Sequence, residues 1–176
     1  MMNRVILYIA ASLDGYIAGV NDELDFLKSV EELNEDYGYN EFLSTVDFVV
    51  MGRRTYDKIL TLAPDFPVDD KKYFILSKTE RAPKANVTFY NGDVEQLIDS
   101  LKGDNNKHVF VDGGAEIVHL LLKKRLIDEI ILSVIPVLLG AGIRLFKGGE
   151  PEQALQLLSA DKYKKGLVQL HYKVIV

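Results

Sequence analysis

Two segments of the chain share a pattern in which an apolar run ends at glycine and a helical pattern follows. The first is Phe48–Tyr56, with Gly52 after the apolar run, and the second is Val109–Glu116, with Gly113 and Gly114 in the same place. Glycine lets a backbone come close to a ligand, and the free N–H groups and dipole of the next helix attract anions. A single turn of this kind also occurs as an ordinary connection, but two of them predict a diphosphate-binding site.

The remaining pattern predicts an α/β fold in one domain over residues 1–176. Apolar runs without alternation are typical of strands covered on both faces, and strands that alternate with helices form mostly parallel sheets. The segment Gly166–Val176 alternates apolar and polar residues instead, and it predicts antiparallel strands at one edge of the sheet. The expected strands are Val5–Ala10, Phe48–Met51, Tyr73–Leu76, Val87–Tyr90, Val109–Val111 and Ile130–Ile135, and the expected helices are Glu31–Leu43, Thr55–Leu60, Val94–Leu101 and Ala115–Lys124.

Composition excludes several classes of function. The chain has no cysteine, and the spacing of its three histidines does not match a metal site, so neither disulfides nor a bound metal is expected. The net charge of -5 argues against a nucleic-acid partner, which would require a basic face. No apolar stretch approaches the ~20 residues of a membrane span, and the N-terminal run lacks a cleavage pattern. We therefore expect a cytoplasmic protein, without a membrane partner, that acts on a small molecule.

Basic and hydroxyl side chains follow two of the predicted strands. Arg53 and Arg54 stand at a helix N-terminus, where two guanidinium groups oppose the helix dipole unless an anion compensates. Thr55 is placed either to cap the helix or to donate to a phosphate. Ser77 and Lys78 follow another strand, where a site for unphosphorylated ribose usually has an acid. They favour the 2′-phosphate of NADPH over NADH, and a solvated loop is the alternative.

Four segments, in this order, resemble the dihydrofolate reductase superfamily: Ser12–Ala18, Met51–Tyr56, Val111–Gly114 and Ile135–Phe146. The last one is most similar to the branch typified by the reductase domain of the bifunctional riboflavin biosynthesis deaminase/reductase. Together the segments are distributed along most of the chain. The resemblance implies a dihydrofolate reductase-like three-layer fold, with a mostly parallel twisted central sheet, helices on both faces and an antiparallel C-terminal hairpin.

The resemblance also implies NADPH as cofactor and a set of residues that hold it. The first glycine turn, with Gly52, Arg53, Arg54 and Thr55, would contact the phosphates and the adenosine ribose, and Ser77 and Lys78 would lie beside the 2′-phosphate. The second glycine turn, with Gly113, Gly114, Ala115 and Glu116, would wrap the diphosphate. Ala10 and Ile17 would border the nicotinamide. A homodimer through sheet edges and the C-terminal region is implied as well, although Leu167–Val174 is equally compatible with the edge strand of a monomer.

A proton donor is harder to assign from the sequence. Folate reductases place an acid on the helix before the Met-Gly-Arg strand, and counting back from Met51 favours Asp36 here. Asp25 is the alternative acid, although it could equally cap a short helix. The absence of tryptophan counts against a folate substrate. A phosphorylated substrate would need further basic groups, for which Arg144 is a candidate.

The resemblance implies an NADPH-dependent reductase that transfers a hydride to a pyrimidine-like or pteridine-like heterocycle. The nearest activity is that of 5-amino-6-(5-phosphoribosylamino)uracil reductase in riboflavin biosynthesis. Three alternatives remain at this point: dihydrofolate reductase-type activity, a non-catalytic NADPH-binding regulatory module, and an assembly subunit in which the motifs serve only the fold.

Overall fold

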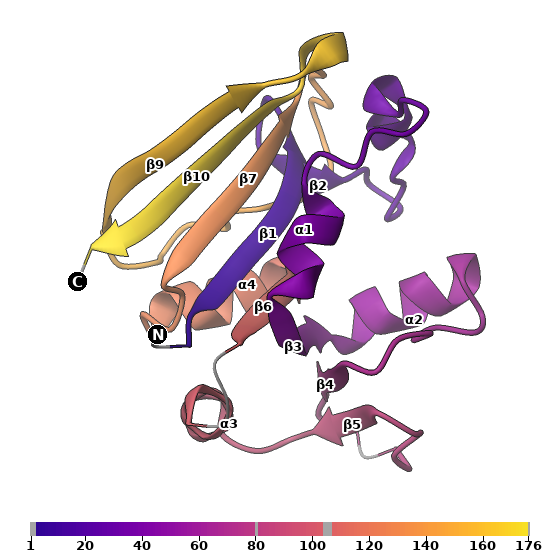
Figure 1. The fold of residues 1–176 in the computed structure, drawn as a ribbon, viewed down its shortest axis with the longest axis vertical. Coiled ribbons are helices and arrows are strands. Elements are labelled where there is room, and N and C mark those ends of the chain that lie inside the picture. Colours follow the sequence, from indigo (N-terminus) through magenta and orange to yellow (C-terminus); the bar gives the residue numbers. More distant parts are fainter. Residues whose placement is uncertain (1–2, 80, 104–106, 176) are drawn as a thin grey trace.

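An eight-stranded sheet forms the centre of the molecule in the computed structural model, which describes residues 3–79, 81–103 and 107–175 (Figure 1). The strand order is β5-β4-β3-β6-β1-β7-β10-β9, in which neighbours are parallel from β5 to β7 and antiparallel from β7 to β9. The predicted mostly parallel sheet with an antiparallel C-terminal hairpin is therefore confirmed. The strands are β1 (Val5–Ser12), β3 (Val46–Gly52), β4 (Lys72–Leu76), β5 (Val87–Tyr90), β6 (His108–Gly113), β7 (Glu129–Ile135), β9 (Ala154–Lys162) and β10 (Val168–Ile175).

Helices cover both faces of the sheet and complete a three-layer fold (Figure 1). Side chains alternate along β6, so that Val109 and Val111 pack with α3 (Val94–Lys102) and α4 (Ala115–Lys123). Phe110 enters the opposite core, with α1 (Tyr39–Ser44) and α2 (Arg53–Leu62). Within the part of the chain that the structure describes, no helix is both long and apolar enough to cross a membrane.

The predicted helix over Glu31–Leu43 is wrong in extent. The structure has a short 3₁₀-helix at Asp25–Val30, then turns up to Gly38, and only then the six-residue α1. The Asp36 carboxylate accepts hydrogen bonds from the backbone N–H groups of Gly38 and Asn40, both at 3.0 Å. Asp36 therefore satisfies backbone donors at the start of α1, and this local bonding competes with a longer helix.

The hairpin was predicted, but the position of its first strand, β9, was not. All nine of its residues are exposed, and it pairs with β10 at the edge of the sheet. A strand that buries neither face lacks the apolar alternation by which strands are recognised.

A small two-stranded sheet of β2 (Tyr16–Ala18) and β8 (Ile143–Arg144) lies beside the carboxyl ends of the central strands. The turn before β2 is fixed by Asp14, whose carboxylate accepts from Ser12 Oγ at 2.5 Å and from the N–H groups of Leu139 and Gly140 at 3.0 and 2.7 Å. These donors lower the pKa of Asp14 to about 2. The charged carboxylate thus ties the β1–β2 turn to the loop before β8.

Candidate active site

A cleft of about 670 Å³ opens at the carboxyl ends of β3, β4 and β6, between the starts of α2 and α4. Ligands of open α/β sheets bind at this end of the strands. We call it the cationic cleft, after the basic side chains described below. Its lining contains most of the residues predicted to hold NADPH: Gly52, Arg53, Arg54, Thr55, Ser77, Lys78, Gly114, Ala115 and Glu116.

The two glycine turns meet inside the cationic cleft. Gly52 immediately precedes α2 and Gly114 immediately precedes α4, and neither N-cap glycine has a side chain to cap its helix. The Gly114 N–H donates to Thr55 Oγ1 at 2.9 Å, which joins the turns. A Cβ on Gly114 would lie 3.0 Å from that same oxygen, and one on Gly52 would lie 3.0 Å from Ile117. Both helix N-termini face the cleft, where the glycines leave room for a ligand to approach the backbone closely.

The basic side chains of the cleft are Arg53, Arg54, Lys58 and Lys78, against the acids Asp22 and Glu116. Arg54 lies 3.3 Å from Asp22, Arg53 lies 3.4 Å from Asp57, and Glu116 pairs with Lys147 outside the lining. Exposed pairs of this kind contribute at most about 1 kcal/mol each. An incoming phosphate can therefore displace the acidic partners of both arginines.

A second cavity, of about 420 Å³, lies on the α1 side of the sheet, and we call it the aromatic cavity. The segment Leu24–Leu27 stands between the two spaces, since Leu24 lines the cationic cleft and Leu27 the aromatic cavity. Strands β1 and β2 also stand between the two spaces, since Ala10 on β1 lines the aromatic cavity and Ala18 on β2 lines the cationic cleft. The lining of the aromatic cavity is Tyr8, Ala10, Leu27, Val30, Glu31, Glu32, Glu35, Asp36, Tyr37, Tyr39, Asn40, Ser133, Ile135 and Leu167.

Hydrogen bonds between three strands fix the polar floor of the aromatic cavity. Gln169 Nε2 on β10 donates to Tyr8 OH on β1 at 2.9 Å and to Ser133 Oγ on β7 at 3.1 Å. Tyr8 OH in turn donates to the carbonyl oxygen of Tyr37 at 3.0 Å. Burial raises the pKa of Tyr8, so its hydroxyl stays protonated near neutral pH. The floor is therefore neutral, and its geometry is set by the sheet.

The two acids chosen from the sequence are both exposed and ionised. Asp36 lines the aromatic cavity, but hydrogen bonds from the N–H groups of Asn40 and Gly38 lower its pKa. Asp25 forms a pair with Lys28 at 2.5 Å, and that contact lowers its pKa as well. Neither carboxyl carries a proton near pH 7 in this structure. Their assignment as proton donors stays a prediction without support from these surroundings.

A third carboxyl, Asp112 on β6, has the opposite character. Desolvation raises its pKa to about 7, and the residue keeps partial access to solvent. Leu7 pairs with Val111, so Tyr8 and Asp112 stand at the same level of neighbouring strands. Asp112 projects from the same face as Phe110, whose ring lies 6.2 Å from that of Tyr39.

Asp112 lines neither space as described, but it is adjacent in the fold to residues that line each of them. Tyr8 and Tyr39 line the aromatic cavity, and Gly114, two residues after Asp112, lines the cationic cleft. The charge of Asp112 also contributes, after desolvation, to the raised pKa of Tyr39. Sequence reasoning noted the Val-Asp-Gly-Gly segment only for its glycines. An acid that ends an otherwise apolar strand just before a ligand-binding turn was the available signal.

Two predicted cofactor residues lie outside both linings as the structure describes them. Ile17 on β2 packs against the core under α3 and α4, next to Ala18 in the cleft. Gly113 has a φ of +106°, which suits glycine, and it shapes the turn that presents Gly114. Their contacts with a cofactor stay predictions.

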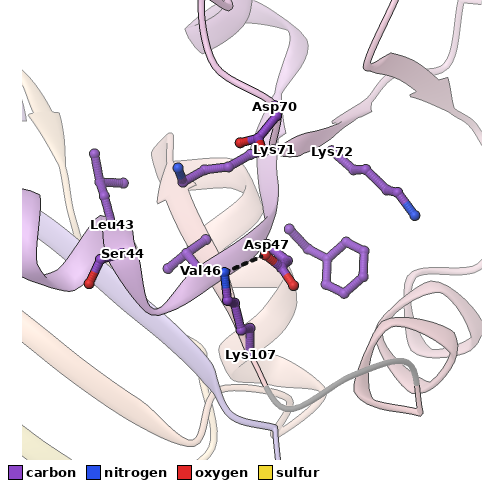
Figure 2. Close-up of a pocket in the computed structure, with 9 residues that line it drawn as sticks. Leu43, Ser44, Val46, Asp47, Asp70, Lys71, Lys72 and Lys107 are labelled. Atoms are coloured by element: carbon purple, nitrogen blue, oxygen red, sulfur yellow. Dashed lines mark ion pairs between the residues drawn. The ribbon is translucent and has the colours of Figure 1, made fainter.

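A third hollow lies at the opposite, amino end of β3 and β4 (Figure 2). Lys71, Lys72 and Lys107 line it together with Asp47 and Asp70, and Lys107 Nζ lies 3.2 Å from Asp47 Oδ1. The charges are mixed, and none of the described residues that line this hollow is a predicted site residue. The candidate active site is therefore the cationic cleft with the aromatic cavity.

The fold and the cleft define an α/β protein of the dihydrofolate reductase-like class, with an anion-binding cleft at the carboxyl ends of its strands. Residues 3–169 match the model of the RibD C-terminal domain. The chain therefore belongs to the RibD C-terminal domain family, as its sequence resemblance suggested.

Proteins of similar length are related to this chain in sequence, in fold or in both. The uncharacterized protein YwjB of Bacillus subtilis is 38% identical over 173 residues, which cover 98% of each protein. A candidate riboflavin biosynthesis protein from Shewanella sp. PV-4 has a solved structure that superimposes with a TM-score of 0.89, at 32% identity, over 98% of this chain and 99% of that one. A pyrimidine reductase-like protein from Corynebacterium diphtheriae shares the fold, with a TM-score of 0.68 over 99% of this chain and 92% of that one, at 14% identity.

Proposed function

We propose that this protein is an NADPH-dependent reductase that transfers a hydride to a pyrimidine-like or pteridine-like heterocycle. The observation that carries the proposal is the adjacency of the two spaces across Leu24–Leu27. One space suits a phosphate-bearing cofactor, and the other suits a flat ring. Membership of the RibD C-terminal domain family supports a reductase.

The cationic cleft fits NADPH by the chemistry of its donors. The helix starts after Gly52 and Gly114 would hold the diphosphate, with Arg53 and Arg54 neutralising its charge. Ser77 and Lys78 would take the 2′-phosphate, because a hydroxyl and an ammonium group stand at the end of β4. When bound, the dihydronicotinamide supplies the hydride. The chain's own residues orient the two partners and supply the proton.

Asp112 is the residue that we assign as the proton source. Reduction of a C=N or C=O bond requires a proton at the heteroatom as well as a hydride at carbon. A carboxyl with a pKa of about 7 is protonated in about half of the molecules at neutral pH, which suits a general acid. Water then returns the proton to the carboxylate, since Asp112 keeps partial access to solvent.

The cofactor half of the proposal is tested by titrating the protein with NADPH and with NADH, following nicotinamide fluorescence. We expect NADPH to bind more tightly than NADH, and Arg53→Ala to weaken NADPH binding at least tenfold. Arg125→Ala is a matched control, because Arg125 contacts the carbonyl oxygen of Glu152 away from the cleft. Failure of both cofactors to bind would refute the reductase. Tight binding without oxidation by any heterocycle would favour a regulatory module.

We further propose that the chain forms a homodimer through β9 and β10. On the edge strand β9, the residues Leu155, Leu157 and Leu158 are each between 45 and 52% exposed to solvent. The neighbouring strand β10 exposes Val168 and Ile175. An exposed apolar edge strand is a ready surface for association. Light scattering after size exclusion should give twice the chain mass. Leu157→Lys should halve that value, whereas a monomeric wild-type protein would contradict the proposal.

A further inference from the structure

We infer that the aromatic cavity is built for an amino-bearing heterocycle without a phosphate group. The inference narrows the substrate class and rests on the proposed function. It departs from the phosphoribosyl substrate that the resemblance implied. Its basis is the charge of the cavity walls, which differs in sign from that of the cationic cleft.

Carboxylates dominate the ionisable groups of the aromatic cavity. Glu31, Glu32, Glu35 and Asp36 line it, and among the described residues its lining contains no lysine, arginine or histidine. The pKa of Asp36 is lowered by its backbone donors, so that this carboxylate keeps its charge near neutral pH. A phosphate dianion in this cavity would meet like charges at several points, whereas amino N–H groups would meet acceptors.

The cations near the rim already have partners. Lys164 Nζ lies 3.5 Å from Glu32 Oε1, and Lys165 Nζ donates to the carbonyl oxygen of Glu31. Lys28 interacts electrostatically with Glu31 and forms an ion pair with Asp25. Lys164 is 82% exposed, so its side chain lies mainly in solvent. These lysines balance part of the charge, and the lining still has more carboxylates than the rim has lysines bound to them.

The arginine that the sequence offered for a substrate phosphate lies elsewhere. The Arg144 guanidinium on β8 stacks over the ring of Tyr16, 4.8 Å from its centre. It lines neither the cationic cleft nor the aromatic cavity as described. The basic group that a phosphoribosyl substrate would require is thus not supplied by this residue.

The rest of the cavity suits a flat ring with hydrogen-bond donors. Tyr8, Leu27 and Ile135 supply aromatic and apolar wall, and the volume is that of a small-molecule site. On the acidic side, Glu32 Oε2 is buried and has no hydrogen-bond partner within the described part of the protein. A buried acceptor without a donor is costly, and a rotation of the Glu32 side chain towards the cavity would let a ligand amino group satisfy it.

The test compares two probes that differ only in the phosphate: 5-amino-6-(ribosylamino)uracil and its 5′-phosphate. Binding is measured by calorimetry, with and without saturating NADP⁺. We expect the unphosphorylated probe to bind at least tenfold more tightly, which corresponds to about 1.4 kcal/mol. The double variant Glu32→Gln/Glu35→Gln should reduce this ratio severalfold. Glu41→Gln/Glu152→Gln removes the same charge from exposed positions outside the cavity and should leave the ratio unchanged.

Three results would overturn the inference: equal or tighter binding of the phosphate, a ratio that the cavity variant does not change, or no binding of either probe. The titration with NADPH alone distinguishes a failure of this inference from a failure of the proposed function. A protein that binds NADPH but prefers the phosphate would keep the reductase proposal and refute the inference. A protein that binds no NADPH would refute the reductase, while the probe comparison without cofactor still decides the preference of the cavity.

Discussion

Replacing Asp112 with asparagine should stabilise the protein above neutral pH and remove its proton source. Burial raises the pKa of this carboxyl from 3.8 to about 7. The folded state therefore binds the proton more tightly than the unfolded state, so the free energy of unfolding falls as pH rises from about 4 to 7. A rise of roughly three pH units corresponds to at most about 4 kcal/mol, and partial solvent access makes this an upper limit.

Asparagine carries no charge to desolvate, so the stability difference between Asp112→Asn and wild type should depend on pH. We expect the gap in midpoint temperature to be small at pH 4 and to grow until pH 7. Above that it should stay constant, at no more than roughly 8–16 °C for a chain of this size. Scanning calorimetry of both proteins from pH 4 to 9 measures the gap directly.

The Asp112→Asn substitution should lower activity, although it raises stability. Turnover of the wild type should fall above about pH 7 as Asp112 ionises, and the asparagine variant should lose about 10²- to 10⁴-fold with no remaining transition at that pH. NADPH affinity should be unchanged, since the carboxyl does not line the cationic cleft. A stability gap independent of pH, or a variant less stable than wild type at pH 8, would refute the reasoning about Asp112.

Three further substitutions test other parts of the structure. Gly114→Ala should weaken NADPH binding at least tenfold, because the new Cβ would lie 3.0 Å from Thr55 Oγ1. Gly103→Ala, where the nearest atom to the new Cβ is 3.7 Å away, is the control, and equal affinities of the two variants for NADPH would contradict a diphosphate site at the Gly114 turn. Asp14→Asn should lower the midpoint temperature of unfolding at pH 6, because the charged Asp14 carboxylate, whose pKa is lowered in the fold, stabilises the folded state. The difference in midpoint temperature from wild type should disappear as pH falls from about 4 towards 2 and the carboxylate is protonated. A difference that stays constant from pH 6 to 2 would argue against this role. Leu121→Ala should lower the free energy of unfolding in urea by about 2–5 kcal/mol, since the Leu121 side chain is fully buried between α4 and the sheet. A loss below about 1 kcal/mol would indicate that neighbouring side chains move in to fill the cavity.

The buried strands and the cofactor turns could be predicted because each has a local cause. β1 and β6 are covered on both faces and therefore read as continuous apolar runs, and the glycine turns after β3 and β6 carry their own signature. The positions of Gly52, Arg53 and Gly114 in one cleft followed from these two patterns. The parallel order of the strands then brought the turns together.

The features that sequence analysis missed depend on tertiary contacts. β9 buries neither of its faces, so its sequence shows no alternation. The helix expected to begin at Glu31 starts only at Tyr39, where Asp36 bonds to the backbone, and a count along the chain could not reveal this. Asp112 acquires its raised pKa from desolvation within the folded sheet, although its place before Gly113 was visible.

The most direct test of the central claim is a crystal structure of the protein with NADPH bound. We expect the diphosphate between the starts of α2 and α4, the 2′-phosphate beside Ser77 and Lys78, and the nicotinamide at Leu24–Leu27, facing the aromatic cavity. Such a complex would establish that the two spaces form one active site. A nicotinamide directed away from the aromatic cavity, or a cofactor bound outside the cationic cleft, would contradict the proposed reductase.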